Sequence, residues 1–221
     1  MATWAIGDIH GCLTALETVL GLMRPTSADT VVVLGDVVDR GPDSRGAIDR
    51  ILQLATECRV VTITGNHEEM MLSALEGGQW LEPWLRHGGQ RVLDSYGGDP
   101  TAVPEGHLAF LKGGVDYWFT ERAIFVHANL EPGVALEAQT TEWLRWRRVL
   151  GSEPVFAEGY RVFCGHTPQL SGVPGEWPGW LAIDTQAYAG GWLSAVEVES
   201  GVLYQANERG EAREGRGWPV A

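Results

Sequence analysis

TVVVLGDVVDRG, residues 30–41, joins a short apolar run directly to a loop that contains two aspartates and an arginine. Three consecutive valines followed by a leucine predict a buried strand over Thr30–Leu34. GDIHG at 7–11 and GNHE at 65–68 also follow directly on runs of β-type apolar residues. Because the carboxyl ends of parallel strands gather at one edge of a sheet, we expect these three polar clusters to converge.

The rest of the chain divides into a first half of alternating elements and a second half of strands. The first half is expected to contain strands at Thr3–Ile6, Thr30–Leu34 and Arg59–Thr64, separated by helices at Leu13–Met23 and Ser44–Thr56. The second half is expected to contain strands at Val115–Phe119, Ala123–His127, Tyr160–Cys164, Trp180–Ile183, Trp192–Val198 and Val202–Gln205, with one helix around Glu142–Leu150. The tail after Glu208 is expected to be loosely ordered.

This order of elements predicts an α/β fold. The parallel strands of the first half and the meander-like strands of the second half favour two mixed β-sheets, packed as a central sandwich and flanked by helices. Residues from about 68 to 112 have a helical, irregular pattern that is rich in Gly and Trp, and they predict a small helical cap insertion. We expect a single domain over residues 1–221 that includes this cap.

Composition restricts the class of protein. The chain has 16 basic and 29 acidic residues and a formal net charge of −13, which disfavours binding along a nucleic acid. No apolar run approaches membrane-spanning length, and a first strand at Thr3–Ile6 leaves no room for a leader, so we expect no membrane association and a cytoplasmic location. Cys12, Cys58 and Cys164 lack CxxC spacing and are expected to be buried thiols in a reducing compartment.

The polar residues at the predicted strand ends form a set of candidate metal ligands. The set consists of Asp8, His10, Asp36, Asn66, His127 and His166. Such a mixture of imidazole and oxygen donors suits Mn, Fe or Zn better than Ca. One aspartate has two oxygens and can therefore bridge two ions about 3.5–4 Å apart.

Each of these residues also has a simpler interpretation. An Asp after a strand is often the N-cap of the next helix, and a lone His behind an apolar strand is often a satisfied core residue. We accept the core interpretation for His87 and His107, which lie outside the strand-end motifs. For the remaining residues, a simpler interpretation would have to hold at five strand ends at once. This coincidence is improbable and favours the metal site. Trp80, Trp84 and Trp118 could form an aromatic platform for a substrate, but core packing is the preferred interpretation.

Taken in order, GDIHG, GDVVDRG, GNHEE, VHA at 126–128 and GHTP at 165–168 resemble the signature of the phosphoprotein phosphatase family of metallophosphoesterases. The resemblance is greatest to the small bacterial and phage-type Ser/Thr protein phosphatases, and it extends to IDT at 183–185 and GGWLSA at 190–195. Arg40 and Glu68 narrow the resemblance to this family. Related nucleases and phosphodiesterases typically have GNHD, with Asp at the position of Glu68, and lack the arginine. Asn129 and Gln186 stand where the family often has Gly.

The resemblance implies a role for each motif residue. Asp8, His10 and Asp36 would bind one metal ion, and Asn66, His127 and His166 would bind a second ion together with the bridging Asp36. A hydroxide held between the ions would attack phosphorus. His67 would protonate the leaving group, and Asp39 would orient His67; helix capping is the alternative role for Asp39.

The resemblance also implies two arginines that bind phosphate. Arg40 would hold two phosphoryl oxygens with its planar guanidinium, unless it forms a surface salt bridge instead. The second arginine is expected near the predicted helix at 142–150, where the register selects Arg148 and leaves Arg145 as the fallback. Three arginines within four positions could also belong to a solvated helix face.

The resemblance implies a protein Ser/Thr phosphatase that uses two divalent ions, with Mn²⁺ as the preferred ion and Fe or Zn as alternatives. Its expected substrate is a phosphoprotein or phosphopeptide, and phosphotyrosine is a further option. One alternative is a symmetrical dinucleoside tetraphosphate hydrolase, which shares GDxxDRG and GNHE; such enzymes tend to be longer, so the compact chain favours the phosphatase. A non-catalytic, metal-dependent binding module is a third hypothesis.

Overall fold

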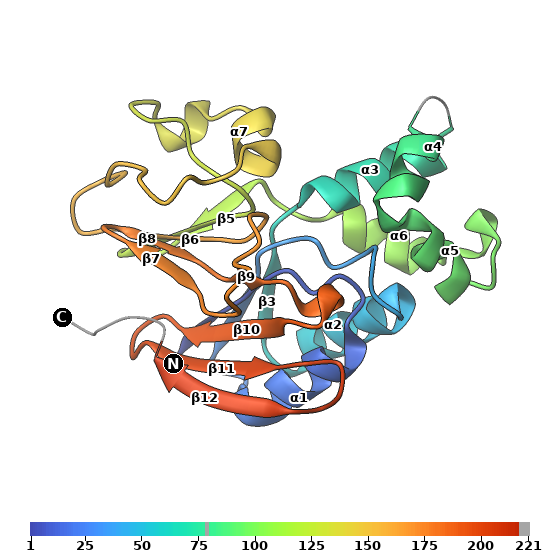
Figure 1. Ribbon diagram of the computed structural model, residues 1–221, viewed down its shortest axis with the longest axis horizontal. Helices are drawn as coiled ribbons and strands as arrows, with labels where there is room; N and C mark the ends of the chain where they lie inside the picture. The colour runs from blue at the N-terminus through green and yellow to red at the C-terminus, as the bar shows by residue number, and fades with distance from the viewer. Residues whose placement is uncertain (78–79, 217–221) are drawn as a thin grey trace.

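The computed structural model describes residues 1–77 and 80–216 and contains two mixed sheets (Figure 1). In the first sheet the strand order is β12-β11-β10-β1-β2-β3, and β9 pairs with β10. Its strands are β1 (Thr3–Ile6), β2 (Thr30–Val33), β3 (Arg59–Thr62), β9 (Asp184–Thr185), β10 (Trp192–Glu197), β11 (Val202–Ala206) and β12 (Ala212–Arg216). Strands β1, β2 and β3 are parallel, and the others pair antiparallel.

The second sheet has the strand order β4-β5-β6-β8-β7. Its strands are β4 (Tyr117–Phe119), β5 (Ala123–Val126), β6 (Arg161–Cys164), β7 (Gly175–Trp177) and β8 (Trp180–Ala182). Strands β5, β6 and β8 are parallel, whereas β4 and β7 are antiparallel edge strands. The prediction of two mixed sheets is therefore confirmed.

The helices lie around this pair of sheets. The α-helices are α1 (Leu13–Met23), α2 (Ser44–Glu57), α3 (Asn66–Leu75), α4 (Leu81–Trp84), α5 (Gln90–Ser95), α6 (Glu105–Lys112) and α7 (Thr141–Trp146). The remaining helical segments are short. They are the π-helical η1 (Leu85–Gly89) and the 3-10 helices η2 (Pro100–Ala102), η3 (Leu136–Ala138) and η4 (Ala187–Ala189). In Figure 1 helices α3 to α6 form one group beside the sheets, while α7 lies apart over the second sheet. The described part of the segment predicted as a helical cap, residues 68–77 and 80–112, is mainly helical, as expected.

Alternation along the strands separates the core into layers. Ala5 on β1 and Phe125 on β5 belong to the apolar cluster between the two sheets. The neighbouring residues Trp4 and Ile6 belong to the cluster that packs the first sheet against the helices. Successive side chains of a strand point to opposite faces, so one strand serves two layers. The resulting arrangement is a sandwich of two sheets with helices on its outer faces.

Two sequence predictions fail at the level of elements. The helix expected over 142–150 is α7, which ends at Trp146 because Arg147 has extended backbone angles (φ −80°, ψ 117°). The tail after Glu208 is not loosely ordered as far as Arg216, since Ala212–Arg216 is strand β12 and pairs with β11 over five residues. All five residues of β12 are exposed, so no apolar alternation marks this strand in the sequence.

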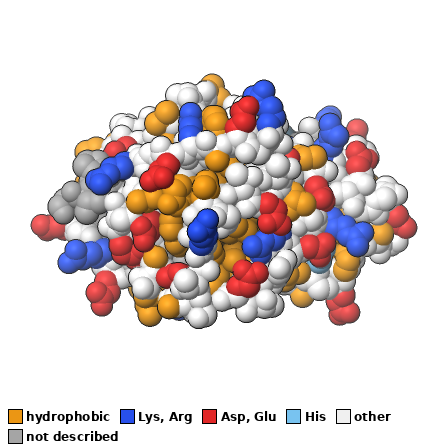
Figure 2. Space-filling model, turned by 90° about the horizontal axis from the view of Figure 1, so that it is seen from below, with side chains coloured by type: hydrophobic (Ala, Val, Ile, Leu, Met, Phe, Trp, Pro, Cys, Tyr) orange, Lys and Arg blue, Asp and Glu red, His pale blue; other side chains and the backbone are white. Residues whose placement is uncertain are grey.

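The surface is mixed in charge. Seen from below, acidic and basic side chains are interspersed around a central group of apolar side chains (Figure 2). Cys12, Cys58 and Cys164 are buried free thiols, as predicted. Within the described residues, every helix is too short or too polar to cross a lipid bilayer.

Candidate metal centre and active site

The candidate site lies where loops leave the carboxyl ends of five strands. His10 follows β1, Asp36 follows β2, and Asn66 begins helix α3 after β3. His127 follows β5 directly, and His166 follows β6. The first sheet thus provides three of these residues and the second sheet provides two. As the sequence predicts, parallel strands that are distant along the chain place their terminal residues together.

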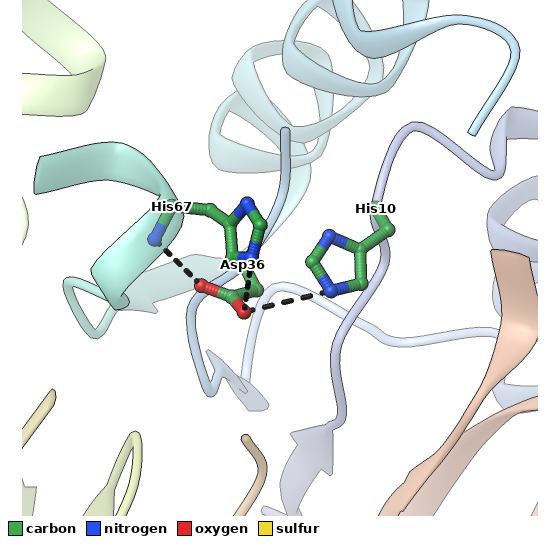
Figure 3. A group of neighbouring side chains, drawn as sticks. All are labelled: His10, Asp36 and His67. Atoms are coloured by element: carbon green, nitrogen blue, oxygen red, sulfur yellow. Dashed lines mark hydrogen bonds and ion pairs between the residues drawn. The ribbon is translucent and has the colours of Figure 1, made fainter. Parts of the chain in front are cut away.

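Asp36 is shared by two groups of candidate ligands. The first consists of His10, Asp36 and His67, and Figure 3 shows the two rings directed at the Asp36 carboxylate. The second consists of Asp36, His127 and His166. Asp36 Oδ2 lies 3.5 Å from His10 Nε2 and 3.9 Å from His67 Nε2, whereas Asp36 Oδ1 lies 3.3 Å from His127 Nε2. The carboxylate therefore presents one oxygen to each group, as a bridging ligand would.

Hydrogen bonding fixes which nitrogen of each histidine carries the proton. His10 Nδ1 lies 2.8 Å from the carbonyl oxygen of Val38, and His127 Nδ1 lies 2.7 Å from that of Leu34. A carbonyl only accepts, so Nδ1 must donate, and Nε2 of each ring faces Asp36 with a lone pair. Burial lowers the pKa of His10 and of His127 below the usual range, which keeps both rings neutral.

In the second group, a carbonyl oxygen also fixes the position of the proton on His166. Its Nε2 lies 3.0 Å from the carbonyl oxygen of Trp146 and donates to it, so Nδ1 has the lone pair. This Nδ1 lies 3.0 Å from Asn66 Oδ1, and His127 Nε2 lies 3.1 Å from the same oxygen. Burial and the neighbouring His127 lower the pKa of His166 to about 4.

Two neutral imidazole nitrogens, an amide oxygen and a carboxylate oxygen thus face one another without a proton between them. Such a set of electron-pair donors fits a divalent cation, and the carbonyl partners are those that ligating histidines typically have. When bound, two divalent ions would lower the pKa of a water molecule and polarise phosphoryl oxygens. The donor set does not distinguish Mn from Fe or Zn.

Asp8 lies at the edge of this cluster. Its two carboxylate oxygens accept the backbone N–H of His166 at 3.2 and 3.0 Å. Burial, together with the negative charges of Asp184 and Asp36, raises the pKa of Asp8 well above its usual range. Asp8 is not a member of either group above, and its role as a ligand stays a prediction.

Asp184 is a buried carboxylate to which the sequence analysis gives no role. It lies on the short strand β9, its Oδ1 accepts the N–H of Gln186, and its Oδ2 has no partner in the described part of the chain. Burial and the charge of Asp36 raise the pKa of Asp184 to about 6. Asp184 adds a further negative charge beside Asp8 and Asp36, which favours cations in the cluster.

His67 differs from the other histidines of the site. Its Nδ1–H donates to Asp39 Oδ2 at 2.5 Å, and Asp39 Oδ1 accepts the indole N–H of Trp84 at 2.8 Å. Burial opposes the charged ring, but Asp36 and Asp39 raise the pKa of His67 above its usual range. His67 can therefore hold a proton on Nε2, which is what a general acid needs.

The capping alternative for Asp39 is wrong. The side chain that caps α2 is that of Asp43, which accepts the N–H of Gly46 at 2.7 Å. Asp39 instead links His67 to Trp84, which the sequence places in the cap. Trp84 is fully buried, so the preferred interpretation of core packing is confirmed for this residue.

The two predicted phosphate arginines lie in one pocket of about 270 Å³ with Asp36, His67 and His166. Arg40 Nη1 donates to His10 Nε2 at 3.1 Å, and its guanidinium lies 4.7 Å from the ring centroid of Tyr188. Arg148 also lines the pocket. Arg145 does not; its guanidinium pairs with Asp116 at 2.6 Å and Glu69 at 3.1 Å. This placement favours Arg148 over Arg145.

Two further residues line the pocket although the sequence did not predict them there. His87 was expected to be a satisfied core histidine, but it is exposed and lines this same pocket, the metal pocket, from η1, so that expectation is wrong. Tyr188 lines the pocket from η4 and packs edge-on against His10. Neither residue follows a predicted strand, so no signal in the sequence marks it. For His107 the core interpretation is confirmed, since it is buried and bonded to Asp49 and Tyr96.

A sandwich of two mixed sheets with two His/Asp groups that share one aspartate defines the class of the metallophosphoesterases. Comparison with known families agrees with this assignment. The model of the calcineurin-like phosphoesterases matches residues 1–170, and the chain belongs to this family. The sequence prediction of a metallophosphoesterase is therefore confirmed.

The relatives include a protein phosphatase and dinucleoside tetraphosphatases, both symmetrical and asymmetrical. Serine/threonine-protein phosphatase 1 of Salmonella typhimurium is 41% identical over 87 residues, which are 39% of this chain and 38% of the relative. The symmetrical bis(5'-nucleosyl)-tetraphosphatase of Neisseria gonorrhoeae is 32% identical over 123 residues, which are 52% of this chain and 44% of the relative. The chain thus spans less than half the length of these curated relatives.

Solved structures share the fold at low sequence identity. The crystal structure of a candidate diadenosine tetraphosphatase superposes with a TM-score of 0.69 at 21% identity, covering 98% of this chain and 94% of that one. The cold-active protein-tyrosine phosphatase of a psychrophilic Shewanella superposes with a TM-score of 0.67 at 18% identity, covering 96% and 80%. At these identities the likeness concerns the fold alone.

Proposed function

We propose that this protein is a metal-dependent phosphoesterase that cleaves dinucleoside tetraphosphates symmetrically. The observation that carries the chemistry is that Asp36, Arg40, His67, Arg148 and His166 line one pocket. For the substrate, matches to symmetrical tetraphosphatases support the proposal: they extend over 123 residues in the Neisseria gonorrhoeae relative and 128 in that of an Acidovorax species, against 87 for the phosphatase.

This choice reverses the preference drawn from the sequence. The compact chain favoured a protein phosphatase because dinucleotide hydrolases tend to be longer. The candidate diadenosine tetraphosphatase weakens that argument, since this chain covers 94% of it and the two are thus similar in size. Chain length therefore does not separate the two activities.

The residues of the pocket would divide the reaction between them. A water oxygen forms a bond to one inner phosphorus and the water releases one proton to the solvent, while the bond from that phosphorus to the central bridging oxygen breaks. The electron pair remains on the leaving nucleoside diphosphate, whose oxygen takes a proton from His67 Nε2. Arg40 and Arg148 balance the charge on the phosphoryl oxygens, while Asp39 and Trp84 hold the ring of His67.

The test is a direct comparison of substrates. Purified protein with Mn²⁺ receives diadenosine tetraphosphate or a phosphoserine peptide, and anion-exchange chromatography separates the products. We expect ADP as the only nucleotide product, at a higher kcat/KM than for the peptide. A mixture of AMP and ATP would contradict symmetrical cleavage, and a strong preference for the peptide would contradict the dinucleotide as substrate.

A protein Ser/Thr phosphatase is the second candidate. The observation in its favour is the 41% identity to the Salmonella typhimurium phosphatase. The same peptide assay decides this candidate. A non-catalytic binding module would be supported only if protein loaded with Mn²⁺ left para-nitrophenyl phosphate intact.

A further inference from the structure

A second, larger cavity adjoins the metal pocket. It has a volume of about 720 Å³, within the range of small-molecule sites, and its lining includes Asn129, Trp143 and Arg147. Trp146 and Arg148 line both this cavity and the metal pocket. The two cavities therefore share a wall, and a ligand that extends beyond the metal pocket past this wall would enter the larger cavity.

The wall of the larger cavity combines aromatic rings with positive charge. The guanidinium of Arg147 lies 5.2 Å from the centroid of the Trp143 ring, and Trp146 is 36% exposed. In the described part of the chain, no carboxylate oxygen lies within 4.0 Å of the guanidinium nitrogens of Arg147 or Arg148, whereas Arg145 has two such partners. Two arginines without acidic partners are notable in a chain with a net charge of −13.

The segment that forms this wall is held in place along its length. The Trp146 carbonyl accepts from the candidate ligand His166, and the Arg148 carbonyl accepts the Asn129 side-chain amide at 3.1 Å. The Val149 N–H donates to the Thr167 hydroxyl at 3.1 Å. Glu153 also lines the cavity, and its carboxylate accepts the N–H groups of residues 150, 151 and 152. Hydrogen bonds within the protein thus hold the wall of this cavity in place.

We propose that the larger cavity binds one nucleoside of a dinucleoside polyphosphate whose inner phosphate occupies the metal pocket. This inference rests on the proposed function. The base would stack on the indoles of Trp143 and Trp146, and Arg147 and Arg148 would contact the phosphates between the base and the metal pocket. The combination favours a nucleotide over a peptide, because both a planar ring and a polyanion find partners in the same wall.

Two variants test the proposal, each with a matched control. Arg147→Gln removes the cation next to Trp143, and Trp143→Ala removes the ring. The control for the first is Arg59→Gln, because Arg59 is also exposed and lies 5.4 Å from the ring centroid of Trp118, away from both cavities. The control for the second is Trp80→Ala, an indole that is 43% exposed and lines neither cavity.

The measured quantity is the ratio of kcat/KM for diadenosine tetraphosphate to kcat/KM for para-nitrophenyl phosphate, which lacks a nucleoside. Stacking of one base is worth about 1–3 kcal/mol, so Trp143→Ala is expected to lower this ratio by roughly 5- to 150-fold, mainly through KM. Arg147→Gln is expected to lower it by about tenfold. The two controls are expected to keep the wild-type ratio. Calorimetric titration of ADP into each protein in EDTA is expected to show weaker binding to Trp143→Ala and Arg147→Gln than to the wild type, and wild-type affinity for the two controls.

The outcomes separate this inference from the proposed function. If the wild type cleaves the dinucleotide but both variants keep its ratio and its affinity for ADP, the subsite assignment is wrong and the proposed function stands. If the wild type cleaves para-nitrophenyl phosphate and not the dinucleotide, both are wrong. If Trp143→Ala raises KM for a phosphoserine peptide and not for the dinucleotide, the cavity binds peptide. Should Trp143→Ala unfold the protein, Arg147→Gln decides.

Discussion

At the scale of single residues, the site is built on an uncommon backbone conformation. His10, Asp36, Asp39, Arg40 and His166 all have positive φ angles, between 48° and 71°. For residues other than glycine this left-handed conformation costs about 1–3 kcal/mol each, and it persists only where the surrounding structure enforces it. Here it directs side chains from separate loops into one pocket.

His67 provides the sharpest prediction at this scale. His67→Asn removes the proton donor but leaves Asp36, His127 and His166 in place, so turnover of phenyl phosphate is expected to fall by roughly 10²–10⁴-fold. Para-nitrophenyl phosphate has a better leaving group and should lose less. Steady-state kinetics on both substrates, with metal content measured by atomic emission, checks this. Equal losses on the two substrates would rule out the general acid, and loss of one metal ion would make His67 a ligand.

At the scale of elements, helix α3 connects the loops of the site. Its Glu68 side chain accepts the N–H groups of Gly65, Asp36 and Val37 at 2.8 to 2.9 Å. This carboxylate accepts the N–H of the N-cap residue Gly65, as the Glu of a capping box does, and ties the loop after β3 to the loop after β2. The position of Asp36 therefore depends on the first turn of a helix that is distant from it in sequence.

Glu68→Gln tests this connection. The amide has one accepting oxygen where the carboxylate has two, so at least one buried N–H loses its partner, and the free energy of unfolding is expected to fall by about 2–4 kcal/mol. Urea unfolding in EDTA measures it. The matched control is Glu69→Gln on the same helix, whose partners Arg145 and Trp146 are nearer the surface and whose loss should cost at most about 1 kcal/mol. Equal losses would contradict the role of Glu68.

The end of α7 determines which arginine faces the pocket. Because the helix stops at Trp146, Arg148 lies in the loop after the helix and lines the metal pocket, while Arg145 remains on the helix and pairs with two carboxylates. Arg148→Gln is expected to raise KM for para-nitrophenyl phosphate by about tenfold, through the loss of a charged hydrogen bond. Arg145→Gln should instead lower stability by about 1 kcal/mol. A raised KM for Arg145→Gln together with an unchanged KM for Arg148→Gln would instead assign phosphate binding to Arg145.

At the scale of the whole molecule, the candidate metal centre lies where the two sheets meet. Asp36 and Asn66 come from the first sheet, whereas His127 and His166 come from the second. A cation held by donors of both sheets binds the folded chain and not the unfolded chain, so it stabilises the protein by mass action. Stability and metal concentration are therefore expected to be coupled.

Thermal unfolding measures this coupling. Mn²⁺ at about 100 times its Kd adds roughly 2.7 kcal/mol for one site, which should raise Tm by about 5–10 °C in a chain of this size. Asp36→Asn removes the shared carboxylate and should abolish both the shift and the activity. Asp43→Asn, which keeps a capping side chain at α2, is the control and should keep the shift. A full shift in Asp36→Asn would contradict the bridging role.

The strand-end clusters show how far the sequence predicts this protein. Helix α1 begins and ends at the predicted residues, and strands β1 and β2 lie within one residue of their predicted bounds. Asp36, His127 and His166 converge as expected. These predictions succeed because runs of β-branched residues and helical periodicity are local properties, and the geometry of parallel strands brings their ends together.

Other features were decided only by the tertiary structure. Strand β12 has no apolar alternation, the end of α7 depends on the backbone at Arg147, and His87 reaches the pocket from a cap that has no strand-end motif. The wall of the larger cavity likewise depends on distant contacts, since the carbonyl oxygens of Trp146 and Arg148 accept hydrogen bonds from His166 and Asn129. The sequence by itself determined the fold class and the candidate metal ligands, because both follow from local patterns. The tertiary structure decided the pocket walls, because these depend on contacts between segments that are far apart along the chain.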